Sequence, residues 1–456
     1  MSTHSVPPGP KGSRLFGTTP LHHGRPLEVL RDWSRQYGDV VSWRIFHLRV
    51  YLLNHPDDIE TVLVTRQRSF IKGRGLRANR EALGNGLLTS EGDFWLRQRR
   101  LIQPAFHRER VAAYAPVMAA RVSEMLDGWR DGETRDVHRD LMRLTLEIAA
   151  QTLFGVSVSH EAARIDAALE VLMAANTTPY RLYPLMRHLP TPSNRRYTRA
   201  VRELDRIVYG IIAERRARTS ATAPQLGAAE CPIGGGGLLS RLLDAADEDG
   251  SRMTDRQLRD ECVTLLLAGH ETTALALSWA CYLLGQHRDV QESLHAELDR
   301  VLGGRPPSLE DLTRLPYTEA VVREALRLYP PAWLMPRLAT EDLEIHGYHI
   351  PKGTSVIMSQ WIVHRDPRWF ADPERFDPGR WSEEFARKLP RFAYFPFGGG
   401  PRICVGASFA LIEAVLLLAA IAQQFRWSLA STEPVEPVAT MTLRPKGGIS
   451  LALSRR

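Results

Sequence analysis

One cysteine lies in a segment whose residues suit a reactive thiolate. Cys404 follows three glycines in the stretch from Phe397 to Gly406, and an apolar helix is predicted from about residue 406 to residue 424. The glycines let backbone N–H groups approach a thiolate, and the helix directs its positive end at the sulfur. Both effects stabilise the anion. A thiolate bound to haem iron favours cleavage of the O–O bond. The other cysteines (Cys231, Cys262 and Cys281) are more typical of small buried hydrophobic residues.

A second chemical signal is a polar cluster inside a long apolar helix. The cluster runs from Ala268 through Gly269, His270, Glu271 and Thr272. The small pair Ala268 and Gly269 lets a flat ligand approach, and the Thr272 hydroxyl can bond a backbone carbonyl and bend the helix. Glu271 then supplies a proton route into an apolar pocket. The alternative is a kinked helix with a capped threonine and a solvated glutamate.

Charged residues elsewhere form weaker signals. Glu324 and Arg327 are three residues apart, so they share a helix face and can pair, although such pairs are usually surface decoration. Haem carries two propionates, and buried carboxylates need cationic or hydrogen-bonding partners. Trp95 with Arg99, Arg337 and Arg402 are candidates for that role, the alternative for each arginine being ordinary surface charge.

Together these segments resemble, in order, the motifs of the cytochrome P-450 family, in its soluble bacterial form. Phe397 to Gly406 matches F-x-x-G-x-R-x-C-x-G, and Ala268 to Thr272 resembles A-G-x-E-T. Glu324 and Arg327 resemble E-x-x-R, followed by P-E-R-F at Pro373 to Phe376, and Trp95 with Arg99 resembles W-x-x-x-R. The resemblance covers nearly the whole chain. One departure is the glycine-rich segment 219–237, which is longer than expected.

The resemblance implies a haem b cofactor with dioxygen as co-substrate. It implies that Cys404 is the axial ligand of the haem iron, that Thr272 stabilises bound dioxygen and that Glu271 helps to deliver protons. Arg375 would join Glu324 and Arg327 in a buried structural network. The other residues that the resemblance implies bind the cofactor are Trp95, Arg99, Ala268, Gly269, Arg337, Phe397, Arg402 and Gly406.

The elements that must position these residues are mainly helical. Periodicity predicts helices over 92–217, a long helix capped by Thr254 that runs to about Gln286, and the terminal helix. Short β-branched stretches predict a hairpin (VVSWRIF and RVYLLN) and later strands (LEIHGYHI, TSVIMS and ISLALS). The expected fold class is mainly α with a small β portion: a cytochrome P-450 fold whose long central helix crosses over the haem. We expect a single domain over 1–456, with an extended entry over 1–24 and a surface loop over 219–237.

Composition indicates a soluble globular protein. The 456 residues are 44% hydrophobic and 24% charged, with a formal net charge of +7. No recognised nucleic-acid motif accompanies the positive charge, so we expect no nucleic-acid partner. The N-terminus has no apolar run of signal-peptide or membrane-span length, and the four cysteines are too few for a disulfide scaffold. We therefore expect a cytoplasmic monomer without a membrane anchor.

The sequence predicts a monooxygenase that inserts one oxygen atom into an apolar substrate, such as a fatty acid, terpene or polyketide, the other atom leaving as water. Pocket walls are expected by resemblance around 70–88, 182–186, 265–272, 332–335 and 441–443. Since there is no room for a flavin domain and no GxGxxG fingerprint, electrons must come ultimately from NAD(P)H through a separate ferredoxin or flavodoxin and its reductase. A basic patch could dock the acidic partner; it comprises Arg97, Arg99, Arg100, Arg108 and Arg110.

Two other functions remain open at this point. A haem-thiolate isomerase or dehydratase acting on peroxides would not need dioxygen, but intact Glu271 and Thr272 argue against it. A non-catalytic haem sensor would need an output domain or a nucleic-acid surface, and the sequence indicates neither. Peroxide-driven turnover without redox partners would favour the first, and haem-dependent partner binding without turnover the second.

Overall fold

The structure is a computed structural model that describes residues 6–13, 15–18, 24–175, 189–220, 237–244 and 252–456. It is mainly helical, with 58% helix and 13% strand, which confirms the expected fold class. The chain divides into two compact units, and neither is continuous in sequence. Unit 1 comprises 1–78, 323–404 and 438–444, and unit 2 comprises 79–322, 405–437 and 445–456. None of these division points falls within 219–237, and a single domain over 1–456 stays a prediction.

Part of the predicted surface loop 219–237 and one predicted pocket wall lie outside this description. Helix α10 (Pro192–Ser220) includes residues 219 and 220, while 221–236 of the predicted loop lie outside the described residues. The predicted pocket wall 182–186 and Cys231 also lie outside them.

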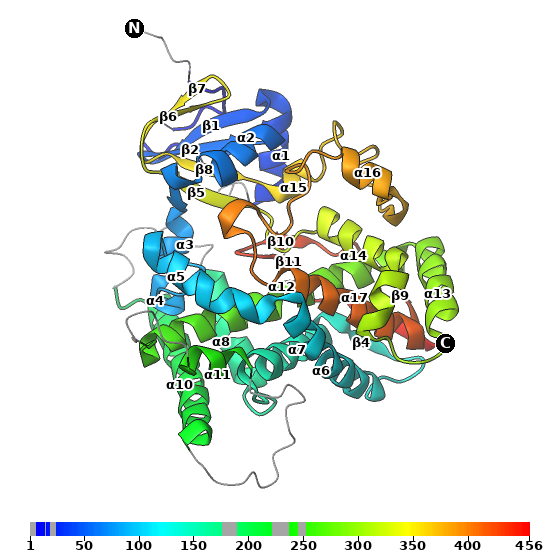
Figure 1. Cartoon of the computed structure of the whole chain (residues 1–456). Coiled ribbons are helices and arrows are strands. Elements are labelled where there is room, and N and C mark those ends of the chain that lie inside the picture. Colours follow the sequence, from blue (N-terminus) through cyan, green and yellow to red (C-terminus); the bar gives the residue numbers. More distant parts are fainter. Residues whose placement is uncertain (1–5, 14, 19–23, 176–188, 221–236, 245–251) are drawn as a thin grey trace. The chain divides into compact units, whose positions relative to one another are not determined.

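A five-stranded sheet organises unit 1, in the order β1-β2-β8-β5-β3 (Figure 1). The predicted hairpin is present, because β1 and β2 pair antiparallel from Val40–Leu53 to Ile45–Leu48. Strand β8 then pairs parallel to β2 and antiparallel to β5. The strands of this unit are β1 (Val40–Ile45), β2 (Leu48–Leu53), β3 (Phe70–Lys72), β5 (Met335–Ala339), β8 (Ser355–Met358) and the separate pair β6 (Leu343–Ile345) and β7 (Tyr348–Ile350).

Both faces of this sheet are buried, because successive side chains of a strand point to opposite faces. Tyr51 and Leu53 of β2 belong to one core cluster, and Val50 and Leu52 belong to another. Short helices complete the unit: α1 (Pro26–Tyr37), α2 (Pro56–Glu60), η2 (Thr61–Thr65), η3 (Gln67–Ser69), α3 (Arg74–Ala78), α15 (Gln360–Val363), η8 (Pro378–Arg380), α16 (Glu383–Lys388) and η9 (Gly400–Arg402).

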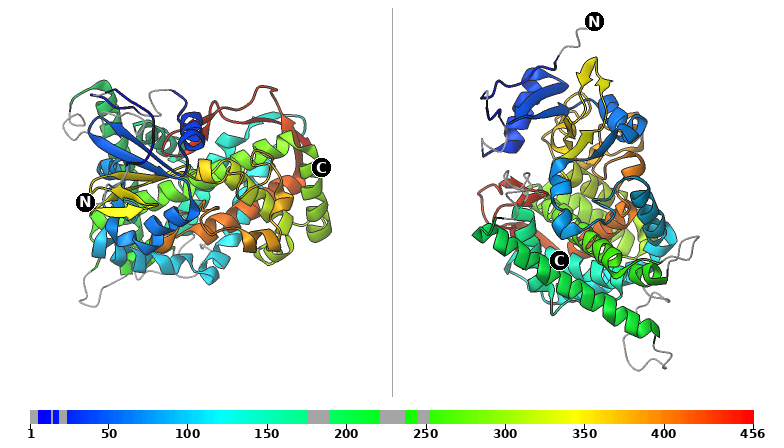
Figure 2. Two further views of the ribbon diagram at one scale, coloured as in Figure 1. Left: turned by 90° about the horizontal axis from the view of Figure 1, so that it is seen from above. Right: turned by 90° about the vertical axis from the view of Figure 1, so that its left-hand side faces the viewer.

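Unit 2 is a helical assembly around α12 (Asp255–Gln286), which packs against α7, α10 and α17. The long green helix in the right-hand view of Figure 2 is α10, which also packs against α8. The other helices are α4 (Arg80–Leu83), α5 (Gly92–Ile102), η4 (Gln103–Phe106), α6 (Arg108–Asp127), α7 (Val137–Ala149), η5 (Ala150–Phe154), α8 (Ala162–Ala175), α11 (Leu238–Asp244), α13 (Arg288–Leu302), η7 (Leu309–Arg314), α17 (Ala407–Gln424) and α14 (Pro316–Leu328), which continues into unit 1.

Helix α12 begins and ends where the sequence predicts. The Thr254 hydroxyl accepts from the backbone N–H of Gln257, and the Gln257 side chain accepts from the N–H of Thr254, which forms a capping box. The 32 residues span about 48 Å. Its side chains are buried along almost the whole length, so tertiary packing holds this helix from several sides.

The terminal helix α17 is long and apolar enough to cross a membrane, but 61% of its most apolar window is buried inside the structure. Burial of this kind is typical of the core helix of a soluble protein. A three-stranded sheet in the order β4-β12-β9 completes unit 2, whereas β10 and β11, which pair with each other, lie mainly in unit 1. These strands are β4 (Thr134–Asp136), β9 (Phe425–Leu429), β10 (Pro437–Ala439), β11 (Leu443–Pro445) and β12 (Ser450–Arg455).

Candidate functional site

The cysteine loop of unit 1 is held tightly against its surroundings. The N–H of Cys404 donates to the carbonyl of Phe397 at 3.0 Å, which closes the loop. Gly400 has a φ of +67°, and a Cβ there would lie 1.9 Å from the carbonyl oxygen of Leu63 in η2. Glycine is therefore required by close packing as well as by the left-handed backbone. Sequence reasoning had assigned the glycines only to the approach of N–H groups to sulfur.

Exposure separates Cys404 from the other described cysteines. Cys404 is exposed, whereas Cys262 and Cys281 are buried. Burial raises the pKa of the Cys281 thiol to about 12 and also raises the pKa of Cys262, so both stay protonated. Because a metal ligand must be a thiolate that the metal can reach, Cys404 is the described cysteine suited to ligation.

Two arginines of unit 1 that could bind an anionic group are partly or fully buried. Arg402 is half-buried within the loop. Arg337 is 6% exposed on β5, where it donates to the Pro336 carbonyl at 3.0 Å and approaches the Met335 sulfur at 3.3 Å. A buried guanidinium of this kind is suited to an anionic ligand group.

At the polar cluster, one face of α12 is accessible to solvent, whereas the rest of the helix is almost entirely buried. Ala268 is exposed and Gly269 and Thr272 are half-buried, although the residues on either side of the cluster are buried. The Thr272 hydroxyl donates to the carbonyl of Ala268 at 2.6 Å, the backbone bond that the sequence predicts. A small residue and an oriented hydroxyl therefore lie one turn apart on an accessible face.

The opposite side of this turn is anchored to neighbouring helices. Glu271 is 2% exposed and His270 is fully buried, so the alternative of a solvated glutamate is excluded. The Thr145 hydroxyl of α7 donates to the His270 carbonyl at 2.9 Å, and His270 Nε2 lies 3.5 Å from Asp166 Oδ1 of α8. These contacts fix the rotation of α12 about its axis, and hence the direction of Thr272.

A buried carboxyl that sequence reasoning missed lies on α17. Glu413 is fully buried, and its burial raises the pKa to about 8, opposed by the hydroxyl of Thr273 on α12. In the sequence, a single Glu in an apolar helix is the signal that could have identified it.

Helix α5 carries the predicted pair Trp95 and Arg99. Both side chains are half-buried, and they lie one turn apart, so they share a face. The Arg99 side chain donates to the Gln103 side chain at 3.1 Å. At the start of α17, a Cβ on Gly406 would lie 3.5 Å from the ring of Phe106, so Gly406 adjoins η4 in the same unit.

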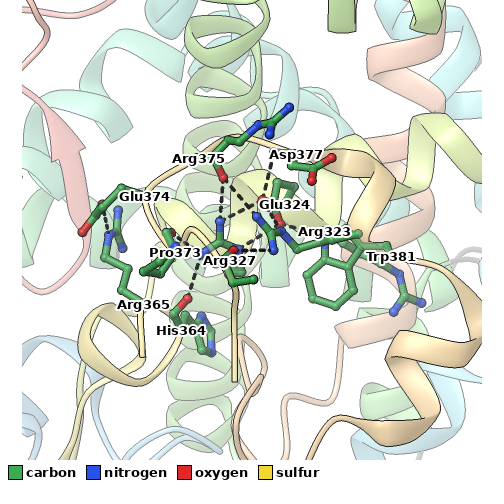
Figure 3. Close-up of polar contacts among 12 residues, drawn as sticks. Arg323, Glu324, Arg327, His364, Arg365, Pro373, Glu374, Arg375, Asp377 and Trp381 are labelled. Carbon is green, nitrogen blue, oxygen red and sulfur yellow. Dashed lines mark hydrogen bonds and ion pairs between the residues drawn. The ribbon is translucent and has the colours of Figure 1, made fainter. Parts of the chain in front are cut away.

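The predicted ion pair is a buried network in unit 1 (Figure 3). Arg327 donates to both oxygens of Glu324 at 2.9 and 2.8 Å, and both side chains are fully buried. Arg327 also donates to the carbonyls of His364, Pro373 and Arg375. One arginine thereby ties α14 to two later stretches of irregular backbone.

The structure differs from expectation at Arg375. Its side chain is exposed, and it joins the network through its carbonyl oxygen. The second guanidinium on Glu324 is that of Arg380, at 2.9 Å, and the indole N–H of Trp381 donates to the other oxygen at 2.9 Å. Sequence reasoning missed both because the intervening turn, which includes η8, decides which side chain points inward.

These residues fit a haem group. Unit 1 has an exposed thiol in a glycine-rich loop that also carries a half-buried arginine, and a buried arginine on β5; unit 2 has an accessible Ala-Gly face beside an oriented hydroxyl. Among the described residues, no group of three His, Cys, Asp or Glu could hold a bare metal ion. A haem iron takes most of its ligands from the macrocycle and needs one donor from the protein, and Cys404 is an exposed thiol of that kind.

Comparisons with known proteins give the same family that the sequence motifs resemble. The family model described as cytochrome P450 matches residues 7–453. The chain is 38% identical to cyclooctatin synthase of Streptomyces melanosporofaciens over 98% of this chain and 93% of that protein. It is 40% identical to cyclooctat-9-en-7-ol 5-monooxygenase of the same organism, over 90% and 87%. The solved structure of retinoic acid bound cyanobacterial CYP120A1 superposes with a TM-score of 0.87 at 28% identity, covering all of both chains.

Proposed function

This chain belongs to the cytochrome P450 family and is a haem-thiolate monooxygenase, and we propose that Cys404 supplies its thiolate. The observation that carries the proposal is the exposure of Cys404 in a loop that its own N–H bond and Gly400 hold rigid. When bound, the haem supplies dioxygen activation, with one oxygen atom inserted into the substrate and the other released as water.

The residues of the chain would hold and orient that group. Ala268 and Gly269 allow the flat macrocycle to approach α12, and Phe397 and Gly406 flank the ligating loop. The haem propionates are anions that need cationic or hydrogen-bonding partners. We assign that role to the four predicted residues Trp95, Arg99, Arg337 and Arg402.

Thr272 and Glu271 would manage protons. The Thr272 hydroxyl donates to Ala268, so its oxygen lone pairs remain directed for accepting a hydrogen bond from a water or a protonated group. Glu271 precedes it in the sequence and is 2% exposed, so its carboxyl lies inside the protein and not in bulk water. We propose that Glu271 passes protons inward and that Thr272 holds the last water in place.

The substrate class we propose is a terpene. The two Streptomyces relatives are named for the same cyclooctat- carbon skeleton, and one name specifies an unsaturated alcohol as substrate. The retinoic acid in the solved relative is also largely apolar. An apolar ligand of this kind suits the accessible face of α12, where the Ala268 side chain offers no polar group.

Electrons would come from a separate acidic ferredoxin or flavodoxin. Arg100, Arg108 and Arg110 are exposed at the end of α5 and the start of α6, and Arg97 and Arg99 are half-buried beside them. Positive charge clustered in this way attracts an acidic partner. We place the protein in the cytoplasm, where NAD(P)H-dependent reductases supply such carriers.

Carbon monoxide binding to the reduced protein tests this function. We expect the reduced wild type to show a strongly red-shifted Soret band with carbon monoxide, and Cys404→Ser to lose that shift while Cys281→Ser keeps it. A wild type that binds no haem, or a band unchanged in Cys404→Ser, would overturn the assignment. Turnover should then be screened with terpene hydrocarbons and alcohols.

A further inference from the structure

A buried pair of carboxyl groups on α12 holds the loop Gly84–Ser90, which overlaps the pocket wall expected at 70–88 and whose anchor the function described above does not include. The N–H of Asn85 donates to Asp260 at 2.8 Å, and the N–H of Leu87 donates to Glu261 at 2.9 Å. Asp260 and Glu261 are 6% and 1% exposed. Two neighbouring residues of one helix therefore bind alternate N–H groups of one loop.

The loop from Gly84 to Ser90 is rigid in itself and closely seated. Thr89 donates its hydroxyl to the Gly84 carbonyl at 2.7 Å, and Arg80 donates to the Thr89 carbonyl at 2.8 Å. A Cβ on Gly86 would lie 2.4 Å from the Thr264 hydroxyl and 2.5 Å from the Asp260 carbonyl oxygen. The loop backbone thus rests directly on α12, and only a glycine allows that approach.

The loop contacts α12 close to the accessible face on which we propose that the substrate lies. Residues 261, 265, 268 and 272 follow helical spacing along one face, so Glu261 precedes Ala268 by two turns, about 10 Å along the axis. The loop therefore covers the turn next to the accessible face that carries Ala268 and Thr272. The loop residues next to the Glu261 bond, Leu87 and Leu88, are apolar, and they are buried and half-buried.

We infer that Asp260 and Glu261 are positioning residues that set the length of ligand the Ala268 face accepts, by fixing the Gly84–Ser90 loop as its end wall. The inference rests on the proposed function, because it takes the Ala268 face as the place where the apolar substrate lies.

Three variants separate this role from general stability. Burial and Asp260 raise the pKa of Glu261 to about 8, so the group is largely neutral near pH 7 and Glu261→Gln keeps both its charge state and an acceptor oxygen. Glu261→Ala removes the acceptor. Gly86→Ala lifts the loop by steric conflict without touching Glu261.

A matched control exists in the same unit. Glu147 is a carboxyl 7% exposed that accepts from the Val158 N–H at 3.4 Å and from the Ser157 hydroxyl, so Glu147→Ala removes the same kind of bond from a different loop.

The test uses two measurements on the holoenzyme. The first is amide hydrogen exchange. The second is the binding of two azoles, imidazole and the longer phenylimidazole, measured by the shift of the Soret band. In Glu261→Ala and Gly86→Ala, exchange in Gly84–Ser90 should accelerate by about tenfold, the effect of losing about 1.4 kcal/mol of protection. The dissociation constant of phenylimidazole should change by about threefold or more while that of imidazole stays constant. Glu261→Gln and Glu147→Ala should match the wild type in both measurements.

Several results would overturn the inference. One is that exchange in Gly84–Ser90 is unchanged in both Glu261→Ala and Gly86→Ala. Another is that exchange becomes faster while phenylimidazole binding does not change. A third is that Glu147→Ala changes loop exchange and phenylimidazole binding as much as these two variants do. Failure of the wild type to give any azole-induced Soret shift would instead contradict the haem function, and the exchange comparison would still report on the loop.

Discussion

The carboxylate of Glu324 accepts a hydrogen bond of 2.9 Å from the guanidinium of Arg380, 56 positions later in the chain. The bond joins α14 to the irregular stretch after Phe376, and the Asp377 N–H donates to the same oxygen at 3.1 Å. Since Arg327 and the indole N–H of Trp381 fill the remaining positions around Glu324, the glutamate has a full set of donors in a site from which water is excluded.

The role of Arg380 can be separated from that of Arg375 by stability. Arg380→Ala should lower the free energy of unfolding by about 2–3 kcal/mol, because it removes a charged donor from a buried carboxylate. Arg375→Ala should change it by about 0.5 kcal/mol or less, since that side chain is exposed. Urea unfolding of the two variants measures the difference. Equal losses would contradict the assignment.

The hydroxyl of Thr272 should control the coupling, which is the amount of product formed per NAD(P)H consumed. Thr272→Ala removes the group that donates to the Ala268 carbonyl, and we expect product formed per NAD(P)H consumed to fall by about tenfold. Thr272→Ser keeps the hydroxyl and should retain most of the coupling. Both variants should keep the carbon monoxide spectrum of the wild type. Unchanged coupling in Thr272→Ala would remove Thr272 from the mechanism.

Buried Glu413 should make stability depend on pH. Its pKa is raised from 4.5 to about 8, so between these values the folded state retains a proton that the unfolded state has lost. The free energy of unfolding therefore falls as pH rises through this window, by at most about 5 kcal/mol.

Glu413→Gln should flatten that slope, and the difference between wild type and variant in denaturant unfolding at several pH values measures it. Glu384→Gln is the control, because that side chain is 66% exposed. A parallel decline in wild type and Glu413→Gln would show that Glu413 titrates normally.

The basic patch should act on the rate of electron transfer. Arg100→Glu combined with Arg108→Glu should slow reduction by an acidic ferredoxin by about tenfold at low salt, and high salt should remove the difference. Arg288→Glu reverses a charge on α13 whose side chain is 81% exposed, and should have little effect. An unchanged rate and salt dependence in the double variant would place the docking surface elsewhere.

What the sequence determined by itself was the local conformation that neighbouring residues decide. The Cys404 loop, the Ala268 to Thr272 cluster and the ends of α12 are short motifs, so residue type and spacing were sufficient to predict their local structure. The cap at Thr254 and the back-bond of Thr272 are within four residues of their partners.

Tertiary structure alone decided the contacts that depend on burial and on backbone direction between distant segments. It selected Arg380 over Arg375 for Glu324, isolated Glu413 from water and brought Asn85 and Leu87 to Asp260 and Glu261. The physical reason is that a side chain's direction and solvation are set by what packs around it. Neither the direction nor the solvation of a side chain can be predicted from the spacing of residues along the chain.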